Sequence, residues 1–472
     1  MRICLVNPPL SSETLYGEWD LSGVDSISPP LGILILAAVV RRAGHKVSVV
    51  DAYAHGLSAH ETAEHVMQCE PEVVGIGSTT PSILGAANLA NIIKRQKPKI
   101  KTILGGAHIS AVPNETFELF PQFDIGVIGE GENTLLELLD MLEKEKANLC
   151  DIDGIIFRKN GKVTKTNTRL AIADMDWLPL PAWDLLPSLF EPYRLSIVGT
   201  TSDKSTAILT SRGCPGRCSF CDTQVFGQKF RGYSASYVIN MIDHLIKNYG
   251  IKDFLIYDDT FVVNHKRLSE ICNALIDGKY KIHWSCCSRV NFVNREILHL
   301  MKKAGCWQIE YGIESGSPEI LKRMKKSITL DQVKDALIWT KEAGIMTRGN
   351  FIFGYLGETK QTLKETIAFL MDIELDYFQQ TFLTPYPGSE VYQTAKNYGE
   401  ANLEWEKMNN MSINFIPEGL TEKELIDFSK MAFKKFYLRP KVIISHIKNL
   451  RSPSIIKHYI KAFIVFLKTL FR

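Results

Sequence analysis

The first 140 residues alternate short apolar runs with longer stretches in which apolar positions recur three and four apart. The short runs predict buried parallel strands, because continuous apolar runs of this length are typical of strands covered on both faces. The longer stretches predict amphipathic helices. We expect strands at 3–6, 46–51, 73–77, 102–104 and 125–128, and helices at 31–43, 59–67, 84–95 and 134–142. Together they favour a doubly wound, Rossmann-like α/β sheet.

The pattern changes between residues 141 and 200. Asn160-Gly161 lies between two short β-type runs, and this pair is a preferred turn of tight hairpins. Prolines then hold residues 178–184 in an extended conformation. We therefore expect a hairpin followed by a semi-rigid linker, in which Trp177 and Trp183 pack structurally.

From residue 201 to about 400, short apolar runs again alternate with helical patterns. A first strand ends just before residue 211, and about six strand–helix units follow one another. We expect strands at 253–257, 282–285, 307–312, 349–353 and 377–383, and helices at 235–247, 266–277, 295–304, 330–343 and 360–371. Helical segments follow to the end of the chain.

The chain of 472 residues is long enough for two or three domains, and the pattern sets their limits near residues 140, 200 and 400. The net charge of +3 gives no argument for nucleic-acid binding. Ten cysteines without a secretory signal favour a reducing, cytoplasmic compartment, where thiols hold metals or lie in cores. No uncharged apolar stretch reaches about 18 residues, so we expect no membrane-spanning segment.

Cys214, Cys218 and Cys221 are spaced as Cys-x3-Cys-x2-Cys. Three thiolates on one tight loop can hold three irons of a cubane iron–sulfur cluster and leave the fourth iron open. Gly213 and Gly216 allow the loop to fold back so that the thiols converge. A structural zinc site needs four ligands, often as two Cys-x2-Cys pairs, and no second pair is present. A redox pair formed by Cys218 and Cys221 would leave Cys214 unexplained.

The stretch from Cys214 to Cys221, with Phe220 before the last cysteine, resembles the cluster motif of the radical S-adenosylmethionine (SAM) enzymes. The resemblance implies a partial (β/α)6 barrel, a 4Fe-4S cluster on the three cysteines, and SAM on the open iron. It assigns Phe220 to the cofactor site. Reduction by an external donor such as ferredoxin or flavodoxin would cleave SAM to methionine and a 5′-deoxyadenosyl radical.

The same resemblance gives SAM-binding roles to residues at the carboxyl ends of the barrel strands, where barrel chemistry lies. Asp258 and Asp259 match the site of the SAM ammonium group, and carboxylates are suitable acceptors for it. Glu314 matches the ribose site, and Arg289 and Arg231 are candidates for the SAM carboxylate. Gly354 lies in the adenine-binding turn, where glycine permits close backbone approach.

Several of these residues also have structural interpretations. The two aspartates would otherwise cap the next element, and Arg289 and Arg231 would otherwise form ordinary ion pairs. Glu310 either points toward substrate or pairs with a cation. The remaining thiols of this region are expected to lie in the core: Cys272, Cys286, Cys287 and Cys306.

The turns after the N-terminal strands form a second group of candidates. Ligands bind open α/β sheets at the carboxyl ends of the strands, and the absence of G-x-G-x-x-G after the first strand disfavours a dinucleotide. The turns instead resemble those of the cobalamin (B12)-binding domain that is joined to radical SAM domains in one large subfamily. That resemblance assigns cobalamin to Asn7, Ser78, Thr79, Gly105, Gly106, His108, Gly129 and Glu130.

One departure from the cobalamin pattern bears on the cobalt ion. Domains that displace the lower axial base carry Asp-x-His-x-x-Gly, whereas Asp51 and His55 have a different spacing and follow the second strand. We therefore expect no cobalt ligand from that motif. His108 either approaches the cofactor or is a hydrogen-bonded loop histidine. The alternative for the whole domain is a Rossmann-like unit that only packs.

The C-terminal tail is basic, with ten Lys or Arg and no acid between residues 434 and 472. Apolar residues recur at helical spacing from residue 456, with lysines on the opposite stripe. Such a helix can lie in an anionic membrane interface, which would place the protein at the inner face of the membrane. It can equally cap the enzyme or bind a partner.

Over residues 1 to 400 the resemblance implies a cobalamin-dependent radical SAM methyltransferase. The radical would abstract hydrogen from an unactivated carbon of a small molecule, and cobalamin would pass a methyl group from a second SAM to that carbon. One alternative is a radical cyclase or oxidase of the anaerobic magnesium-protoporphyrin ester cyclase type. Another is a non-enzymatic corrinoid sensor or carrier, which would leave the three cysteines without a use. A membrane contact would favour a lipid or another apolar substrate.

Overall fold

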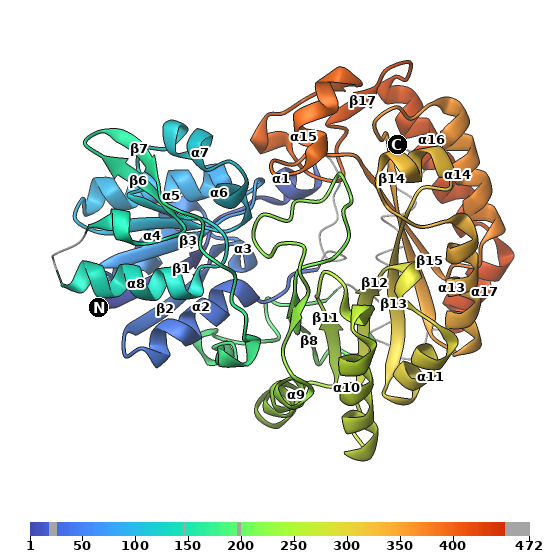
Figure 1. Cartoon of the computed structure of the whole chain (residues 1–472), viewed down its shortest axis with the longest axis horizontal. Coiled ribbons are helices and arrows are strands. Elements are labelled where there is room, and N and C mark those ends of the chain that lie inside the picture. The colour runs from blue at the N-terminus through green and yellow to red at the C-terminus, as the bar shows by residue number, and fades with distance from the viewer. Residues whose placement is uncertain (18–25, 145–147, 196–199, 449–472) are drawn as a thin grey trace.

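The computed structural model describes residues 1–17, 26–144, 148–195 and 200–448. Two α/β units lie side by side, the N-terminal one at the left of Figure 1 and the second one at the right. Among the helices in these ranges, none is long and apolar enough to cross a membrane. The predicted amphipathic helix of the tail falls mainly on residues 449–472, which lie outside the described residues.

The N-terminal unit contains a seven-stranded sheet with the strand order β2-β1-β3-β4-β5-β6-β7. β1 to β5 are parallel, and all five occur where the apolar runs predict them. Because β1 lies between β2 and β3, the order in which strands are added to the sheet reverses beside β1. Ligands bind such sheets at that point. The strands are β1 Arg2–Asn7, β2 Lys46–Asp51, β3 Val73–Gly77, β4 Lys101–Gly105, β5 Ile125–Val127, β6 Ile155–Lys159 and β7 Lys162–Lys165.

Helices cover both faces of this sheet. One core forms between the strands and α4 and α5, and includes Val74 and Leu89. A second core forms on the opposite face against α2 and α8, and includes Leu5 and Leu138. The four predicted helices are confirmed, and four short ones were not predicted because each is shorter than two turns. The helices are α1 Ser12–Tyr16, α2 Leu31–Arg42, α3 Ala52–His55, α4 Ala59–Gln68, α5 Ile83–Gln96, α6 Ala107–Ala111, α7 Pro113–Leu119 and α8 Glu132–Glu143.

The predicted hairpin forms, but it belongs to the N-terminal sheet. Asn160 and Gly161 adopt φ of +51° and +77° between β6 and β7, as the two central residues of a type I′ turn require. β6 pairs antiparallel with β5 and with β7, so the hairpin extends this sheet by two strands. In the following linker Trp183 is buried and stacks on His244 at 5.7 Å, which is a structural contact. The described part of this linker contains 3-10 turns at Leu149–Asp151, Met175–Trp177 and Trp183–Leu185.

The second unit contains six parallel strands in the order β15-β14-β13-β12-β11-β8. Its two end strands, β8 and β15, are not paired with each other, so the sheet is an open, partial barrel. This confirms the fold class expected from the cysteine motif. The strands are β8 Ser205–Ile208, β11 Asp253–Ile256, β12 His283–Ser288, β13 Cys306–Glu314, β14 Met346–Phe353 and β15 Tyr377–Phe382.

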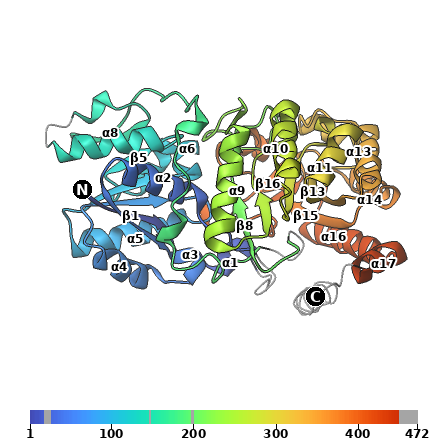
Figure 2. The same ribbon diagram turned by 90° about the horizontal axis from the view of Figure 1, so that it is seen from below.

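Helices cover the outer face of this partial barrel and follow one another across Figure 2. Along β14, buried and half-buried residues alternate: Phe351 and Phe353 pack outward, while Arg348 and Asn350 face inward. The inward side chains of β14 therefore include two half-buried polar groups, Arg348 and Asn350. The helices are α9 Ala235–Tyr249, α10 His265–Asp277, α11 Arg295–Lys303, α12 Pro318–Arg323, α13 Leu330–Glu342 and α14 Lys360–Asp372, with 3-10 turns at Phe261–Val263 and Val290–Phe292.

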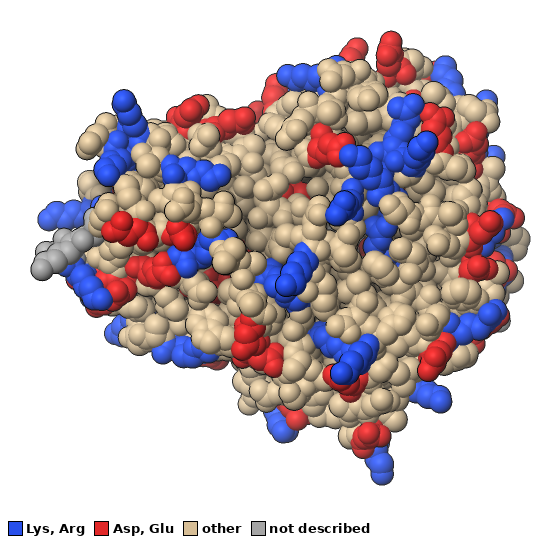
Figure 3. Space-filling model, in the orientation of Figure 1, with Lys and Arg blue, Asp and Glu red and all other residues tan. Residues whose placement is uncertain are grey.

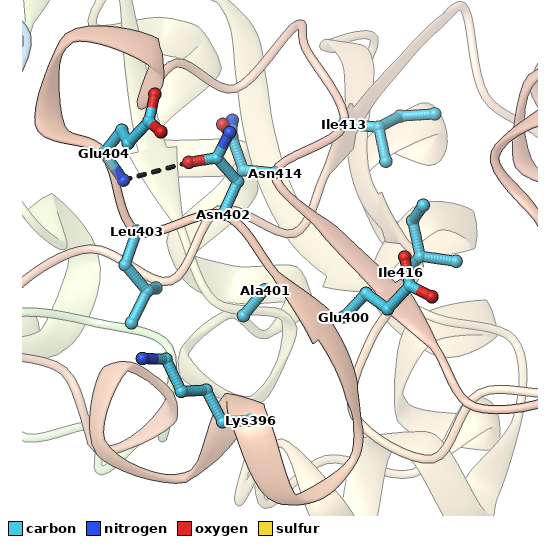
Figure 4. Close-up of a pocket in the computed structure, with 9 residues that line it drawn as sticks. All are labelled: Lys396, Glu400, Ala401, Asn402, Leu403, Glu404, Ile413, Asn414 and Ile416. Atoms are coloured by element: carbon cyan, nitrogen blue, oxygen red, sulfur yellow. Dashed lines mark hydrogen bonds between the residues drawn. The ribbon is translucent and has the colours of Figure 1, made fainter.

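A ribbon of two short strands, β9 (Ser211–Arg212) and β10 (Arg231–Gly232), brackets the cysteine loop. After the barrel, a C-terminal extension returns toward the N-terminal unit, at the top of Figure 1. It carries a shallow pocket of about 560 Å³ beside the paired strands β16 and β17, whose lining residues appear in Figure 4. The elements are α15 Glu390–Thr394, η7 Ala395–Asn397, β16 Gly399–Ala401, η8 Trp405–Lys407, β17 Phe415–Pro417, α16 Glu422–Tyr437 and α17 Pro440–Lys448.

Candidate active site

The cysteine loop turns back on itself at Gly213, which has φ of +83°. A Cβ at this position would lie 2.4 Å from the carbonyl oxygen of Lys229, so both the dihedral and the close approach require glycine. The thiols of Cys214, Cys218 and Cys221 are all free. The loop therefore presents the three donors that the motif predicts.

Hydrogen bonding and charge distinguish the three thiols. The hydrogen bond with Cys221, together with the nearby cations Lys326 and Arg289, lowers the pKa of Cys218 to about 6. Burial raises the pKa of Cys214. Because the thiolate is the form that binds metal, the two cations favour the ligating form of Cys218.

Lys326 is a residue of this site that sequence reasoning missed. Its Nζ lies 2.6 Å from Oε1 of Glu314 and 5.8 Å from the ring centroid of Phe220, and its side chain is 6% exposed. Arg289 reaches the same place, because its Nη1 lies 3.2 Å from Cys218 Sγ and its Nη2 donates to the Lys326 carbonyl oxygen. In the sequence Lys326 is one of several basic neighbours, and no local signal marks it.

Glu314 ends β13 in the left-handed region, with φ of +68°, beside a register shift between β13 and β14. A non-glycine residue in this conformation costs about 1–3 kcal/mol, which the surrounding structure must offset. The buried ion pair with Lys326 holds the carboxylate beside the cysteine loop. Ribose binding by Glu314 and carboxylate binding by Arg289 stay predictions.

The two acids after β11 have different surroundings. Asp258 is buried, and its carboxylate accepts hydrogen bonds from the Thr210 N–H, the Thr210 hydroxyl and the Ser211 hydroxyl. It therefore holds the base of the cysteine loop, and binding of the SAM ammonium group by Asp258 stays a prediction. Asp259 is exposed, accepts from the Gly213 N–H at 3.0 Å, and remains a candidate for that group.

The turn after β14 is built on a buried carboxyl group. Gly354, with φ of +77°, and Tyr355 donate their N–H groups to Glu358 Oε2 at 2.5 and 3.1 Å. Glu358 is 1% exposed, its Oε1 has no hydrogen-bond partner within the described ranges, and burial raises its pKa to about 8. The Gly354 N–H is therefore not free to bind adenine. Adenine binding by the other backbone atoms of Gly354 stays a prediction.

The turns after β3 and β4 interlock at the sheet edge of the N-terminal unit. Gly106 has φ of +101°, and a Cβ there would lie 2.4 Å from the carbonyl oxygen of Ser78. The Ser78 N–H donates to Gly105 at 2.8 Å. The Ser78 hydroxyl is buried and has no hydrogen-bond partner in the described part of the chain. An unsatisfied buried hydroxyl in a glycine cradle fits a ligand that supplies a polar atom.

His108 is a buried loop histidine. Its Nδ1 lies 3.1 Å from Thr80 Oγ1, and its ring meets Trp405 edge-on with centroids 4.4 Å apart. Burial lowers the pKa of His108 to about 4, so the ring is neutral at pH 7. Of the two interpretations, these contacts favour the hydrogen-bonded loop residue, and contact of His108 with cobalamin stays a prediction.

Three further cobalamin candidates lie at the same edge. Asn7 Nδ2 donates to Asp51 Oδ1 at 2.7 Å, and Tyr193 OH donates to Asp51 Oδ2 at 2.9 Å. Thr79 is exposed, and Gly129 has open space where a Cβ would stand. Cobalamin binding by Asn7, Thr79 and Gly129 therefore stays a prediction that the geometry permits.

Glu130 has a different environment from these candidates. Its carboxylate accepts from Arg212 at 2.8 Å, from Arg231 at 2.9 Å and from the Ile172 N–H at 2.7 Å. The residue is 9% exposed, so its carboxylate is occupied by protein groups. Cobalamin binding by Glu130 therefore stays a prediction, and Arg231 forms the ion pair that was its alternative role.

The inner face of the partial barrel carries a polar cluster at mid-strand. Glu310 on β13 pairs with Arg348 on β14 at 3.2 Å, and Asn350 Nδ2 donates to Glu310 Oε1. The side chains of Arg348 and Glu310 are 20% and 23% exposed, and Cys287 lies beside Glu310 in the strand register. Glu310 therefore has the cation partner that was one of its two interpretations. The other thiols of the barrel are buried as predicted: Cys272, Cys286 and Cys306.

The residues present fit both implied cofactors. Within the described ranges, no three His, Cys, Asp or Glu side chains are arranged to hold a single metal ion. Three thiols spread along one loop suit a multi-iron cluster instead, because each thiolate then binds a different iron. Neighbouring cations suit the negative charge of such a cluster. The buried Ser78 hydroxyl, which has no partner among the described residues, suits a polar group of a corrin.

Two family models match the chain, the "Radical SAM superfamily" over residues 208–370 and the "B12 binding domain" over residues 21–139. An uncharacterized methyltransferase of Pyrococcus horikoshii is 35% identical over 449 residues, which are 95% of each chain. The chain belongs to the radical SAM enzymes that carry a B12-binding domain. It is therefore a cobalamin-dependent radical SAM enzyme with a 4Fe-4S cluster.

Two further relatives place this radical SAM enzyme more broadly. The anaerobic magnesium-protoporphyrin IX monomethyl ester cyclase of Rubrivivax gelatinosus is 29% identical over 93% of this chain and 78% of its own. The structure of OxsB, a cobalamin-dependent SAM radical enzyme with aqua-cobalamin and SAM bound, aligns with a TM-score of 0.74. That alignment has 19% identity and covers 99% of this chain and 71% of OxsB, so it shows a shared fold.

Proposed function

We propose that this radical SAM enzyme methylates an unactivated carbon atom of a small molecule. The observation that carries the proposal is that both sets of candidate loops meet: the turn after β5 is hydrogen-bonded to β9, two residues before Cys214. The relative that is 35% identical over almost the whole chain is named a methyltransferase. When bound, the cluster supplies the electron that cleaves SAM, and cobalamin carries the methyl group.

The side chains of this chain would bind and orient the reactants. Arg289 and Lys326 hold positive charge against the cysteine loop, which favours the charged form of its ligands. Asp259 would accept hydrogen bonds from the SAM ammonium group. The Glu310–Arg348 pair faces the inside of the partial barrel, where it can orient a substrate.

A radical cyclisation or oxidation is the second candidate. It is favoured by the 29% identity to a magnesium-protoporphyrin ester cyclase over 93% of this chain. The two reactions differ in what happens to SAM. Both reactions release 5′-deoxyadenosine. Methylation also consumes a second SAM as methyl donor and releases S-adenosylhomocysteine, whereas cyclisation or oxidation releases no S-adenosylhomocysteine.

The test is anaerobic reconstitution with iron, sulfide and cobalamin, followed by SAM, reductant and a cell lipid extract. We expect 5′-deoxyadenosine and S-adenosylhomocysteine to rise together when extract is added, with a labelled methyl group entering an extract compound. The Cys218→Ala variant should produce neither, whereas the matched Cys150→Ala variant, which alters an exposed thiol outside the loop, should behave as wild type. An extract-dependent rise of 5′-deoxyadenosine alone would replace methylation with the second candidate.

The substrate class and the partners belong to the same proposal. It includes a lipid or another apolar compound as substrate and an electron donor such as ferredoxin or flavodoxin. It also includes peripheral contact of the basic tail with an anionic membrane. A chain truncated at Ser452 should sediment less with anionic liposomes than the full chain. Equal sedimentation of the two would remove the membrane contact from the proposal and leave methylation in place.

A further inference from the structure

Four buried charged side chains connect the two halves of the chain. Arg212 donates from Nη1 to Glu130 at 2.8 Å and from Nη2 to Glu132, and Arg231 donates to Glu130 at 2.9 Å. Their side chains are 2–7% exposed. We call Glu130, Glu132, Arg212 and Arg231 the buried charge joint.

The joint lies where the two cofactor sites approach each other in the fold. Glu130 is on the turn after β5, and Glu132 begins α8, so both acids belong to the candidate cobalamin edge. Arg212 and Arg231 are paired across the β9–β10 ribbon, one before and one after the cysteine loop. The joint therefore holds the base of the cysteine loop to the sheet edge of the N-terminal unit.

The composition of the joint indicates that it fixes the relative position of the two segments and adds little stability. Its two acids and two bases balance in charge, and buried ion pairs of this kind add little stability over apolar residues of the same volume. Arg212 contacts both acids through separate nitrogens, which fixes direction as well as distance. The ring of Phe226, 5.0 Å from the Arg212 guanidinium carbon, covers the arginine and helps hold it in place.

We propose that the buried charge joint couples the occupancy of the two cofactor sites, so that cobalamin on the N-terminal unit favours cluster binding by the cysteine loop, and a loaded loop favours cobalamin. The formed joint holds the turn after β5 and the base of the loop in place together. Each cofactor binds best when its own segment is in place, so each favours the formed joint. The proposal rests on the cofactor assignment that underlies the proposed function, and it does not depend on which reaction follows.

The coupling is measured as an affinity ratio. Hydroxocobalamin is titrated into the full chain anaerobically and followed by absorbance, once with the cysteine loop empty and once after reconstitution with iron and sulfide. We expect cobalamin to bind at least about fivefold more tightly to the reconstituted protein, since coupling between sites typically spans about 5- to 150-fold. Equal affinities of the two wild-type forms would overturn the proposal.

Two variants test whether the joint carries the coupling. Arg212→Lys keeps the charge but cannot bridge both carboxylates, and Glu132→Gln keeps the shape but removes one charge. In both variants the cobalamin affinity of the reconstituted protein should be about equal to that of the protein with an empty cysteine loop. Arg295→Lys, which alters an exposed pair with Glu342, is the matched control and should keep the wild-type ratio. If both variants keep the wild-type affinity ratio, the buried charge joint does not carry the coupling and the proposal is wrong.

Coupling is reciprocal, so a second measurement uses the cluster-free protein alone. Hydroxocobalamin should slow alkylation of Cys214, Cys218 and Cys221 by iodoacetamide in wild type and leave it unchanged in Glu132→Gln. If one variant loses its fold by circular dichroism, the other variant and the wild-type titration still decide the question. Absence of methyl transfer, with coupling present, would reject the proposed function and leave this inference standing.

Discussion

Glu358 offers a direct test of how the barrel holds its candidate adenine turn. Its carboxyl group accepts the N–H groups of Gly354 and Tyr355 and is otherwise enclosed, and burial raises its pKa from 4.5 to about 8. In the unfolded chain the group loses its proton near its ordinary pKa, whereas the folded chain retains the proton to about pH 8. The folded state therefore binds more protons between pH 4.5 and 8, and stability falls as pH rises through that window.

The magnitude follows from the shift in pKa. At 1.36 kcal/mol per pKa unit, the rise from 4.5 to about 8 corresponds to a loss of roughly 5 kcal/mol by pH 9. Glu358→Gln keeps an oxygen acceptor for the two N–H groups and has no charge to bury. We expect the variant to match wild type near pH 5 and to exceed its stability by up to roughly 5 kcal/mol at pH 9.

The assay is urea unfolding of the cluster-free protein, followed by tryptophan fluorescence at pH 5, 7 and 9. Glu390→Gln is the control, because Glu390 is an exposed partner of Lys325 and its removal should change stability by less than about 1 kcal/mol. A difference between Glu358→Gln and wild type that stays constant from pH 5 to pH 9 would refute the argument. SAM binding by Glu358→Gln at pH 7 should be retained, because the wild-type carboxyl is then mostly protonated.

Three other predictions concern the two cofactor sites. Cys218→Ala should lose the reconstituted cluster, measured as bound iron and as absorbance, because two thiolates remain on the loop. Lys326→Met should destabilise the protein by about 3–5 kcal/mol in urea unfolding, since it leaves the Glu314 carboxylate buried without its partner. Lys325→Met, at the neighbouring exposed position, should cost less than about 1 kcal/mol, and equal losses would contradict the assignment. His108→Phe should bind hydroxocobalamin with an unchanged absorbance spectrum, whereas a spectral shift would show that His108 reaches the cobalt.

The strands and long helices were predictable because each has a clear period of apolar positions. β1 to β5 and β11 to β15 lie within a few residues of the apolar runs, and the cysteine motif identified the fold class of the second unit. The hairpin at Asn160-Gly161 was predictable from its turn residues. Its partner was not, because pairing with β5 depends on which sheet edge remains free, and local sequence does not show this. The domain limits at 140, 200 and 400 stay predictions.

Residues of the site were predictable where a motif fixes their place, and less so where the outcome depends on long-range partners. Asp258 and Glu130 both follow strands, as ligands often do, but Thr210 and the two arginines of the joint occupy their carboxylates. Lys326 was missed for the converse reason, since an ordinary surface pattern hides a side chain that turns inward to Glu314. The role of such a side chain depends on its burial and on partners far away in the sequence. Neither can be predicted from the spacing of nearby residues.

The contact between His108 and Trp405 has a consequence for biosynthesis. The N-terminal sheet emerges from the ribosome long before Trp405 is made, so the ring of His108 and the side chain of Phe120 remain uncovered during synthesis of the whole barrel. A fragment that ends before the C-terminal extension would keep this apolar patch open to water and to other nascent chains. Separate expression of the N-terminal unit should therefore yield an aggregation-prone product, and co-expression with the rest of the chain should rescue its solubility.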